Sequence, residues 1–543
     1  MIQNKMDFSM FKNRIFGYIL TTLILAGCAT THDQAPENDW FGEYDSLSTS
    51  APINMYGTLS DGYGANTSDT THNMAVLLPL SGDNAPVGKT IRTSVETAIL
   101  QSGAKNLNVS FYDTTENLND TIKTVLAGNP EIIIGPVFSN NARIVREEKP
   151  ENLPVLSFTS DATAVGDGVM TMALMPTNGI ESIVREMNAD KIKKFIIMAP
   201  DTDSGHLMAG TAIRAAEISE IEPVGIFYYN EKDTDSIKNI AQTASLNNAR
   251  TTAHTRARQV LSDILINEQL TAIEKSRLNI QLDKLAKTET VGTVPYQAIL
   301  FLGGGEDTKT LASFLRYYNV GASEAKFYGT TMWDGSDIAS DITMSGAKYA
   351  TLSDINPEFN TLYEKMSGTQ PNRLATFGYD ATNMAIGMMY SDKSNVAYLL
   401  DPSGYIGTDG LFRLKPTGDN ERALRIVKLN GTGTPIESRA AAESFSTPLY
   451  NIEQRHIKPA AAMELQTPGI DPDNYIQIPD RLRSKYRSKT IGANITEPTK
   501  FQRSQIIAFL PEDDSAPIKS ENYKPVKLES VNRSYIDEYE IEE

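Results

Sequence analysis

The chain has 543 residues, of which 40% are hydrophobic, and this is enough to build a large core or more than one lobe. Its formal net charge is −18 and its pI is about 4.9. Because a phosphate backbone is bound by clustered Lys and Arg, this charge argues against a nucleic-acid partner. The 5 histidines are scattered, with no spacing that puts two on one face, so we expect no metal site and no cofactor.

The first residues read as a targeting segment. A basic start precedes the apolar run Ile15–Leu25, which is too short to span a bilayer as a mature helix. The run ends in Leu-Ala-Gly-Cys28, which resembles the lipobox of bacterial lipoproteins. The resemblance implies a signal peptide at residues 1–27 and a lipid on Cys28, the only cysteine of the chain. An ordinary secretory signal with a chance cysteine is the alternative.

The residues after the cysteine predict where the chain is held. Ala29 resembles the residue found in outer-membrane lipoproteins rather than in those retained at the inner membrane. We therefore expect the periplasmic face of the cell envelope, at the outer membrane, with membrane contact through the lipid anchor only. Residues 28–72, rich in Asp, Asn, Ser, Thr and Gly, read as the lipidated cysteine and a flexible tether.

The stretch Met74–Leu100 predicts the first strand, turn and helix. The apolar run ends at Ser81-Gly82, and Val, Ile and Ala then recur at helical spacing. The carboxyl end of such a strand faces the ligand crevice, which makes Ser81 a candidate site residue. Residues Gly82–Thr90 resemble a phosphate-binding loop, but five residues separate the glycines where that loop has four, so we expect no nucleotide.

From residue 73 to about residue 445, unbroken apolar runs alternate with amphipathic helical patterns. Such runs are typical of parallel strands covered on both faces, so we predict a doubly wound α/β fold. This many strands favours two lobes over one sheet. The predicted strands are Leu107–Tyr112, Glu131–Gly135, Pro154–Phe158, Lys194–Ala199, Val224–Tyr229, Ala298–Leu302 and Lys326–Tyr328.

Three later segments depart from this alternation. Residues 233–290 exceed one crossover and read as a helical insertion, either a helical pair lying on its own lobe or a partner-binding protrusion. Residues 410–420 and 424–431 read as an antiparallel hairpin. Residues 446–543, dominated by Pro, Ser, Asn and mixed charge, read as a disordered tail.

The order of motifs resembles a known family. IIIGPVFSNNA at 132–142, LPVLSFTSDA at 153–162 and IIMAPDTDSG at 196–205 resemble the type I periplasmic binding proteins that bind branched-chain amino acids. KFYGTTMWDG at 326–335 and LATFGYDATNMA at 374–385 resemble, more specifically, the penicillin-binding-protein activator lipoproteins. The resemblance implies two lobes joined by a hinge, lobe one from 73–177 and 356–389, lobe two from 178–354 and 410–429.

The same resemblance implies site residues. In the amino acid binders, hydroxyls and amides at strand ends hold the ligand. The matching positions of lobe one are Ser139, Ser157, Thr159, Ser160 and Asp161. For Ser139 and Thr159, helix capping is an equal alternative.

The second lobe departs from the amino acid binders. Ser204 stands where those proteins commonly have a tyrosine, which removes an aromatic wall. Asp161 in lobe one likewise stands where a threonine is frequent, and its charge would repel a ligand carboxylate. Trp333 and Asp334 match the activator signature, with a packed aromatic beside a turn as the alternative.

We therefore expect a lipid-anchored regulator that binds a cell-wall synthase, a penicillin-binding protein, and stimulates it without catalysis of its own. The alternative is a receptor that delivers amino acids or small peptides to an ABC-type transporter, and a muropeptide is a further candidate ligand. A hydrolase is disfavoured, because Asp201 and Asp203 lie in a turn without a base, metal or nucleophile. No residue is predicted to be catalytic.

Overall fold

The computed structural model describes residues 51–55, 70–115, 117–391, 393, 395–445 and 458–494. The predicted signal peptide, Cys28, most of the tether and residues 495–543 lie outside the described residues. Within the described ranges, no helix combines the length and the apolar character that a membrane crossing requires.

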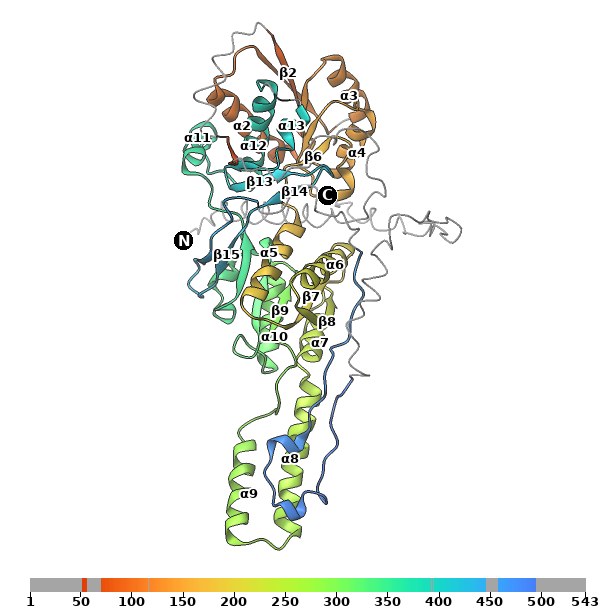
Figure 1. Cartoon of the computed structure of the whole chain (residues 1–543), viewed down its shortest axis with the longest axis vertical. Helices are drawn as coiled ribbons and strands as arrows, with labels where there is room; N and C mark the ends of the chain where they lie inside the picture. Colours follow the sequence, from red (N-terminus) through yellow and green to blue (C-terminus); the bar gives the residue numbers. More distant parts are fainter. Residues whose placement is uncertain are drawn as a thin grey trace, which may run out of the picture. The chain divides into compact units, whose positions relative to one another are not determined.

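Lobe one is built on a five-stranded parallel sheet in the order β3-β2-β4-β5-β6 (Figure 1). Apart from the edge strand β3, whose residues are half-buried or exposed, its strands are mostly buried hydrophobic runs, as expected for a sheet covered on both faces. They are β2 (His72–Leu78), β3 (Leu107–Asp113), β4 (Ile132–Ile134), β5 (Val155–Ser157) and β6 (Val169–Thr171).

The helices of lobe one cover both faces of this sheet. On one face, α2 packs against α12 so closely that a Cβ at Gly378 would lie 3.0 Å from Ile91 and 3.1 Å from Ser94. A side chain at position 378 would therefore push the two helices apart. The helices are α2 (Ala85–Ser102), α3 (Leu118–Ala127), α4 (Ser139–Glu148), α11 (Pro357–Ser367), α12 (Arg373–Met389) and α13 (Asn395–Leu399).

Lobe two repeats the doubly wound order in a seven-stranded sheet, β16-β15-β11-β10-β9-β7-β8. All of its pairs are parallel except those of β15 with β11 and β16. The predicted two-lobed, doubly wound α/β fold is thereby confirmed. The strands are β7 (Lys194–Pro200), β8 (Glu222–Tyr229), β9 (Ala298–Phe301), β10 (Lys326–Gly329), β11 (Lys348–Thr351), β15 (Arg425–Lys428) and β16 (Ile436–Arg439).

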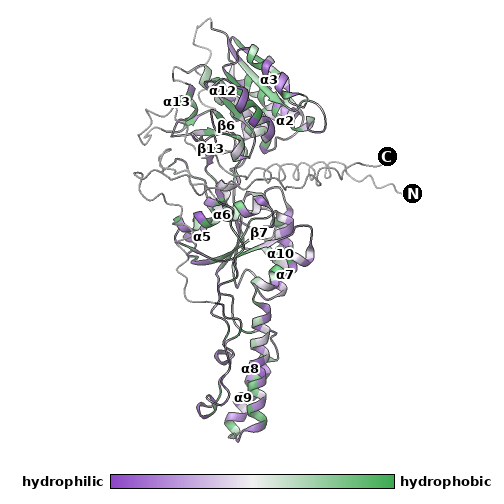
Figure 2. Cartoon of the chain, turned by 90° about the vertical axis from the view of Figure 1, so that its right-hand side faces the viewer, coloured by the Kyte–Doolittle hydropathy of each residue, from purple (hydrophilic) through white to green (hydrophobic). Residues whose placement is uncertain are grey.

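The helices of lobe two follow its strands. Hydrophobic residues colour the sheets green in Figure 2, while the helices carry mixed colours. The helices that pack on this sheet are α5 (Pro176–Ala189), α6 (Asp203–Ile218), α7 (Thr234–Ala244) and α10 (Gly305–Tyr317).

The predicted hairpin of residues 410–431 is wrong. β13 (Gly410–Leu414) pairs with β12 (Tyr405–Gly407) and β14 (Asn420–Arg422) in a small four-stranded sheet with β1 (Ile53–Asn54). Thr408, between β12 and β13, donates to Asp380 of α12 at 3.1 Å, and the Arg422 guanidinium lies over both Phe412 of β13 and Phe377 of α12, so β13 packs with lobe one rather than lobe two. Only β15 joins the sheet of lobe two, because the chain crosses between the lobes at residues 423–424.

The insertion contains a helical pair with a core of its own. α7 packs on lobe two, but α8 (Asn247–Asn267) and α9 (Ala272–Leu285) extend from it as an antiparallel pair, here called the finger, residues 247–285 (Figure 1). Arg250 fixes the base of the finger: its side chain donates to the carbonyl oxygens of Gly292, Tyr318 and Asn319 at 3.2, 3.1 and 3.3 Å.

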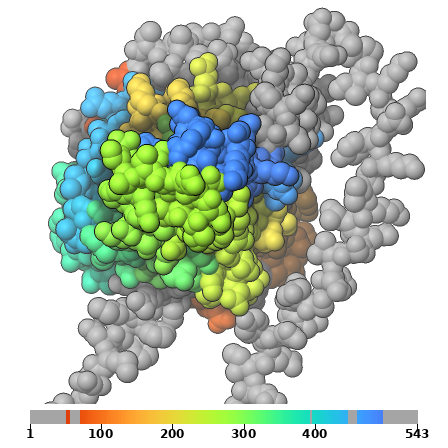
Figure 3. Space-filling view, turned by 90° about the horizontal axis from the view of Figure 1, so that it is seen from below, coloured from red at the N-terminus to blue at the C-terminus, as the bar shows by residue number. Residues whose placement is uncertain are grey.

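Part of the tail predicted to be disordered is ordered. Residues 458–494 run along lobe two and the finger, as Figure 3 shows in blue beside yellow-green. Met463 exchanges hydrogen bonds with Ile226 of β8 at 2.9 and 3.0 Å. Ile470, Ile476 and Leu482 are buried in one cluster with Leu261, Ile264 and Leu278 of the finger. The prediction of disorder is wrong here because the finger supplies an apolar face that this segment covers.

Candidate functional site

The carboxyl ends of the strands mark the candidate site in both lobes. In lobe one the strand order reverses between β2 and β4, and in lobe two between β7 and β9. Ligands of open α/β sheets bind in the crevice at such a reversal. The chain also crosses between the lobes directly after β6 and β11, so these carboxyl edges adjoin the crossings.

In lobe one, Ser157 and Thr159 are bonded within the protein. Ser157 is fully buried, and its hydroxyl donates to the carbonyl oxygen of Pro136 at 2.8 Å and accepts from the amide of Thr159 at 3.2 Å. The Thr159 hydroxyl accepts from the amide of Asp161 at 3.1 Å. Ser160 is also buried and hydrogen-bonded. The Ser157 and Thr159 hydroxyls shape the loop after β5, and Thr159 bonds a loop amide rather than capping a helix as the alternative had predicted.

Asp161 is also committed to internal partners. Its side chain forms an ion pair with Arg143 of α4, accepts from the amide of Thr163 at 2.8 Å and so caps the short 3-10 helix Ala162–Ala164. Only 5% of the side chain is exposed. Asp161 therefore fixes the loop to α4, and its carboxylate is already neutralised.

Ser81 and Ser139 remain at the surface of the lobe-one edge. The Ser139 side chain lies in the first turn of α4 and does not cap that helix, whose N-cap residue is Phe138. The Ser81 hydroxyl donates to Asp113 at the end of β3. Burial opposes ionisation of Asp113, but the hydrogen bonds from Ser81, Leu80 and Thr115 outweigh it and lower its pKa to about 2.

In lobe two, two buried hydroxyls point to the strand reversal. Ser204, 5% exposed, and Tyr229, 1% exposed, have hydroxyl oxygens with no hydrogen-bond partner among the described residues. Tyr229 ends β8 opposite Pro200 of β7, and its hydroxyl packs on Gly303, where a Cβ would lie only 1.8 Å away. The Tyr229 hydroxyl thus reaches across β7 to the loop after β9. The sequence analysis missed Tyr229, because only this long-range contact marks it.

An acidic pair lies beside these hydroxyls. Asp307, in the first turn of α10, shares a hydrogen bond with Glu231 after β8. Burial and the neighbouring carboxylates of Glu231 and Glu306 raise the pKa of Asp307 to about 7. The sequence analysis missed this pair, whose two members are 76 positions apart in the printed sequence (307 − 231).

Trp333 and Asp334 have different surroundings. Trp333 is 1% exposed, packs between Phe301 and Tyr349 and donates from its indole nitrogen to Thr308 at 3.2 Å, so it is a packed core residue, as the alternative interpretation held. The Asp334 carboxylate accepts a hydrogen bond from the Thr351 hydroxyl. Asp334 as a whole is exposed to solvent. Surrounding protein raises the pKa of Asp334, although Thr351, Arg373, Tyr349 and Arg425 oppose that shift.

Buried charges hold the crossings together. Arg422, 4% exposed, pairs with the buried Asp409 at 3.2 Å and donates to the carbonyl oxygen of Met172 in the first crossing. Asn420 donates to the carbonyl oxygens of Thr171 and Ala173 at 2.9 and 2.7 Å. The end of β14 is therefore the point to which the crossing after β6 is tied. The described residues bring together no group of three His, Cys, Asp or Glu side chains that could hold a metal ion.

Comparisons with known proteins bear on the family. A family model described as "LppC putative lipoprotein" matches residues 65–289. The chain resembles the LppC lipoproteins over that segment. The sequence analysis predicted a relationship to activator lipoproteins with a type I periplasmic-binding-protein-like domain, and that relationship is confirmed as a similarity over residues 65–289.

Individual relatives are distant. The chain is similar to the penicillin-binding protein activator LpoA of Mannheimia succiniciproducens, with 24% identity over 202 residues, covering 36% of this chain and 34% of that one. The chain spans about a third of the length of the curated relatives that it matches.

Solved structures also resemble the chain. The LpoA C-domain of Haemophilus influenzae aligns with a TM-score of 0.46 and 17% identity over 67% of this chain and 99% of that chain. The leucine-binding protein LivK of Thermotoga maritima aligns with a TM-score of 0.40 and 15% identity over 68% and 98%.

Proposed function

We propose that the protein is a lipid-anchored regulator at the periplasmic face of the outer membrane that stimulates peptidoglycan synthesis by binding a penicillin-binding protein. The match to the lipoprotein family and the printed name of the Mannheimia relative support this proposal. The protein adds no catalytic step. Its effect comes from binding the active state of the synthase more tightly than the inactive state.

The finger is the observation that carries the proposal. It has a core separate from those of the lobes and is braced by residues 458–494, so it presents a stable surface away from the crossings. Ile266, Ile273 and Ile280 are 78%, 66% and 63% exposed on it. Ile273 and Ile280 lie seven positions apart on α9 and therefore share one face. Exposed large apolar residues on one face are typical of a protein-binding surface.

The lobe-one hydroxyls support the same choice. Ser157, Thr159 and Asp161 already have internal partners. A ligand that used these groups would have to break internal hydrogen bonds, each contributing about 1 kcal/mol. This favours recognition through a protein surface over recognition of a small amino acid by lobe one.

A binding measurement tests the proposal. The purified full-length chain in mild detergent is titrated against a purified class A penicillin-binding protein. We expect saturable binding that the double variant Ile273→Asp, Ile280→Asp weakens by at least about tenfold. The matched control Ile218→Asp changes an isoleucine of α6 that is 74% exposed, and it should bind like the unmodified chain. Equal binding by both variants would contradict a role for the finger.

A ligand receptor is the second candidate, because two buried hydroxyls of lobe two have no hydrogen-bond partner among the described residues. Ser204 and Tyr229 would be satisfied by a bound amino acid, small peptide or muropeptide. A ligand at a hundredfold excess over its Kd stabilises the fold by about 2.7 kcal/mol, so a thermal-shift screen would detect it. Tyr229→Phe should abolish the shift if the hydroxyl contacts the ligand, and a screen without any shift would argue against the receptor.

A further inference from the structure

Lobe one contains a cavity that the predicted site does not use. Its volume is about 420 Å³, within the range of about 300–1,000 Å³ that small-molecule sites occupy. It lies at the start of β5 and β6, around Pro154 and Gly168, whereas Ser157 lies at the opposite end of β5. The cavity is therefore separate from the strand ends described above, and a function for it goes beyond the proposed regulator.

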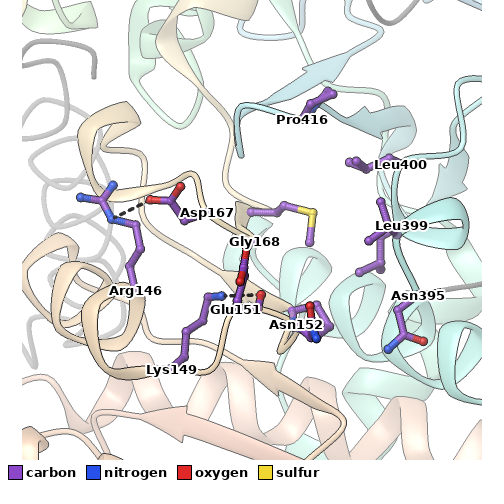
Figure 4. Close-up of a pocket in the computed structure, with 13 residues that line it drawn as sticks. Arg146, Lys149, Glu151, Asn152, Asp167, Gly168, Asn395, Leu399, Leu400 and Pro416 are labelled. Atoms are coloured by element: carbon purple, nitrogen blue, oxygen red, sulfur yellow. Dashed lines mark hydrogen bonds and ion pairs between the residues drawn. The ribbon is translucent and has the colours of Figure 1, made fainter. Parts of the chain in front are cut away.

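The walls of the cavity differ in chemistry. One wall is apolar: Val396, Leu399 and Leu400 come from α13 and the residue after it, and Met170 of β6 also lines the cavity. Figure 4 shows Leu399 and Leu400 on the side of the cavity opposite Arg146 and Lys149. The other wall carries two cations at the end of α4, Arg146 and Lys149, and two acids, Glu151 and Asp167; Asp167 lies 4.0 Å from Arg146, which leaves the Lys149 ammonium as the cation to be matched by a ligand. This arrangement matches a ligand with an apolar body and a negatively charged end.

The two cations play different parts. Arg146 is already held, since its Nη1 donates to the carbonyl oxygens of Thr163 and Val165 at 2.9 and 2.8 Å, and its Nε lies 4.0 Å from Asp167. Lys149 is 9% exposed, and its Nζ donates to the carbonyl oxygens of Pro150 and Glu151 at 3.2 and 3.3 Å. An ammonium has three N–H groups, so one remains for a ligand.

The Lys149 ammonium lacks a contacting counter-ion. Among the described residues, no carboxylate lies within 4.0 Å of its Nζ. Burial lowers the pKa of Lys149, while Asp167 and Glu151 act against that shift from farther away. The ammonium is packed against Gly168, where a Cβ would lie 3.2 Å from Nζ. A buried cation paired only with main-chain oxygens gains most from an anion that enters the cavity.

We propose that this cavity binds a small aliphatic carboxylic acid, with its carboxylate on Lys149 and its hydrocarbon body on the α13 wall. The carboxylate accepts the remaining N–H of the ammonium. The hydrocarbon is removed from water by Val396, Leu399, Leu400 and Met170.

Hexanoate is the probe for this proposal. The full-length chain in non-ionic detergent is titrated by calorimetry, with a detergent blank, and binding is followed in parallel by saturation-transfer NMR. We expect saturable binding of hexanoate and at least about tenfold weaker binding of hexan-1-ol, since the alcohol cannot form an ion pair with the ammonium. No saturable hexanoate binding, or equal binding of hexan-1-ol, would overturn the proposal.

Two variants separate the charge from the hydrocarbon wall. Lys149→Met should weaken hexanoate at least about tenfold and leave hexan-1-ol unchanged. Lys123→Met, on α3 with a side chain 71% exposed, is the matched control and should bind as the unmodified chain does. Val396→Trp fills the cavity from the half-buried end of α13 and should abolish binding of both probes, which keeps the test decisive if Lys149→Met fails to fold. Unchanged hexanoate binding by Val396→Trp would contradict the site.

Discussion

At the scale of single residues, the crossings depend on charges that are buried and paired. Arg422 and Asp409 are 4% and 0% exposed, and the guanidinium of Arg422 also lies over the rings of Phe377 and Phe412, 4.7 and 4.9 Å from their centroids. Such a buried ion pair stabilises the folded state little more than two well-packed apolar residues would. Replacing only one member is much more destabilising, because the other charge stays buried with a weaker partner.

Arg422→Met should therefore destabilise the protein by up to about 3–5 kcal/mol, because the buried Asp409 would lose its nearest cation and keep only the longer contact with Arg373, 4.0 Å away. Urea unfolding followed by circular dichroism measures this change. Arg92→Met is the control: Arg92 pairs with Glu96 on the surface of α2, and its loss should cost no more than about 1 kcal/mol. Equal midpoints for the two variants would mean that the buried pair does not hold the crossings.

Asp307 predicts a pH effect of definite sign. Its pKa is raised from 3.8 to about 7, so between these values the folded state binds more protons than the unfolded state, and stability falls as pH rises. Asp307→Asn removes this cost. The variant should match the unmodified chain near pH 4 and exceed it by about 1 kcal/mol at pH 8, after allowance for partial exposure to solvent.

Thermal melts of both chains from pH 4 to pH 8 test this prediction. A stability difference that stays constant over the range would show that Asp307 ionises normally. Glu217→Gln, which changes an exposed acid in the last turn of α6, serves as the matched control.

At the scale of elements, residues 458–494 and the finger stabilise each other, and one histidine fixes where this segment begins. His206 stacks on Tyr228 with ring centroids 3.8 Å apart. Its Nδ1 lies 2.8 Å from the carbonyl oxygen of Ala460, and its Nε2 lies 2.8 Å from Asp201. Both ring nitrogens thus face acceptors, an arrangement that suits the doubly protonated ring.

The attachment of this segment should weaken as pH rises. Burial lowers the pKa of His206, but the hydrogen bonds to Asp201 and Ala460 and the nearby acids outweigh this and raise it above 6.5. The stabilisation is therefore complete below pH 6.5 and is lost as pH rises through the folded-state pKa. Hydrogen exchange at the Met463 amide, corrected for intrinsic rates, should be faster at pH 8.5 than at pH 6. His206→Gln should remove the difference, and an unchanged difference would exclude His206.

The elements that the sequence predicts correctly are rich in apolar residues that are close together in the chain, whereas the segment it misses has isolated apolar residues. All seven strands predicted after the first are present, because each is rich in apolar residues. β6 and β11 are missed, although β4 and β9, which are equally short, are found. The order of residues 458–494 is missed because their apolar side chains, such as Leu465 and Ile476, are isolated in sequence and pack on partners about two hundred positions away.

At the scale of the whole molecule, the fold follows from the sequence more fully than the site does. The two sheets repeat one strand order, which the alternation of runs and helices already implied. The site residues carried over by resemblance have two kinds of surroundings. Ser157 and Asp161 are bonded within the loops of lobe one, while the buried Ser204 hydroxyl has no hydrogen-bond partner in the part of the chain that the structure describes. A Ser or Asp side chain at a strand end can cap a helix, form an ion pair or hydrogen bond within the protein, or bind a ligand. Which of these it does depends on residues far away in the sequence.

The central claim is that the protein stimulates a cell-wall synthase through the finger. The most direct measurement is the rate of glycan polymerisation by a purified class A penicillin-binding protein at increasing concentrations of the full-length chain. We predict a saturable rise in rate that is lost with Ile273→Asp, Ile280→Asp and retained with Ile218→Asp. A rate that does not change when the unmodified chain is added, under conditions in which the synthase is active, would contradict the account.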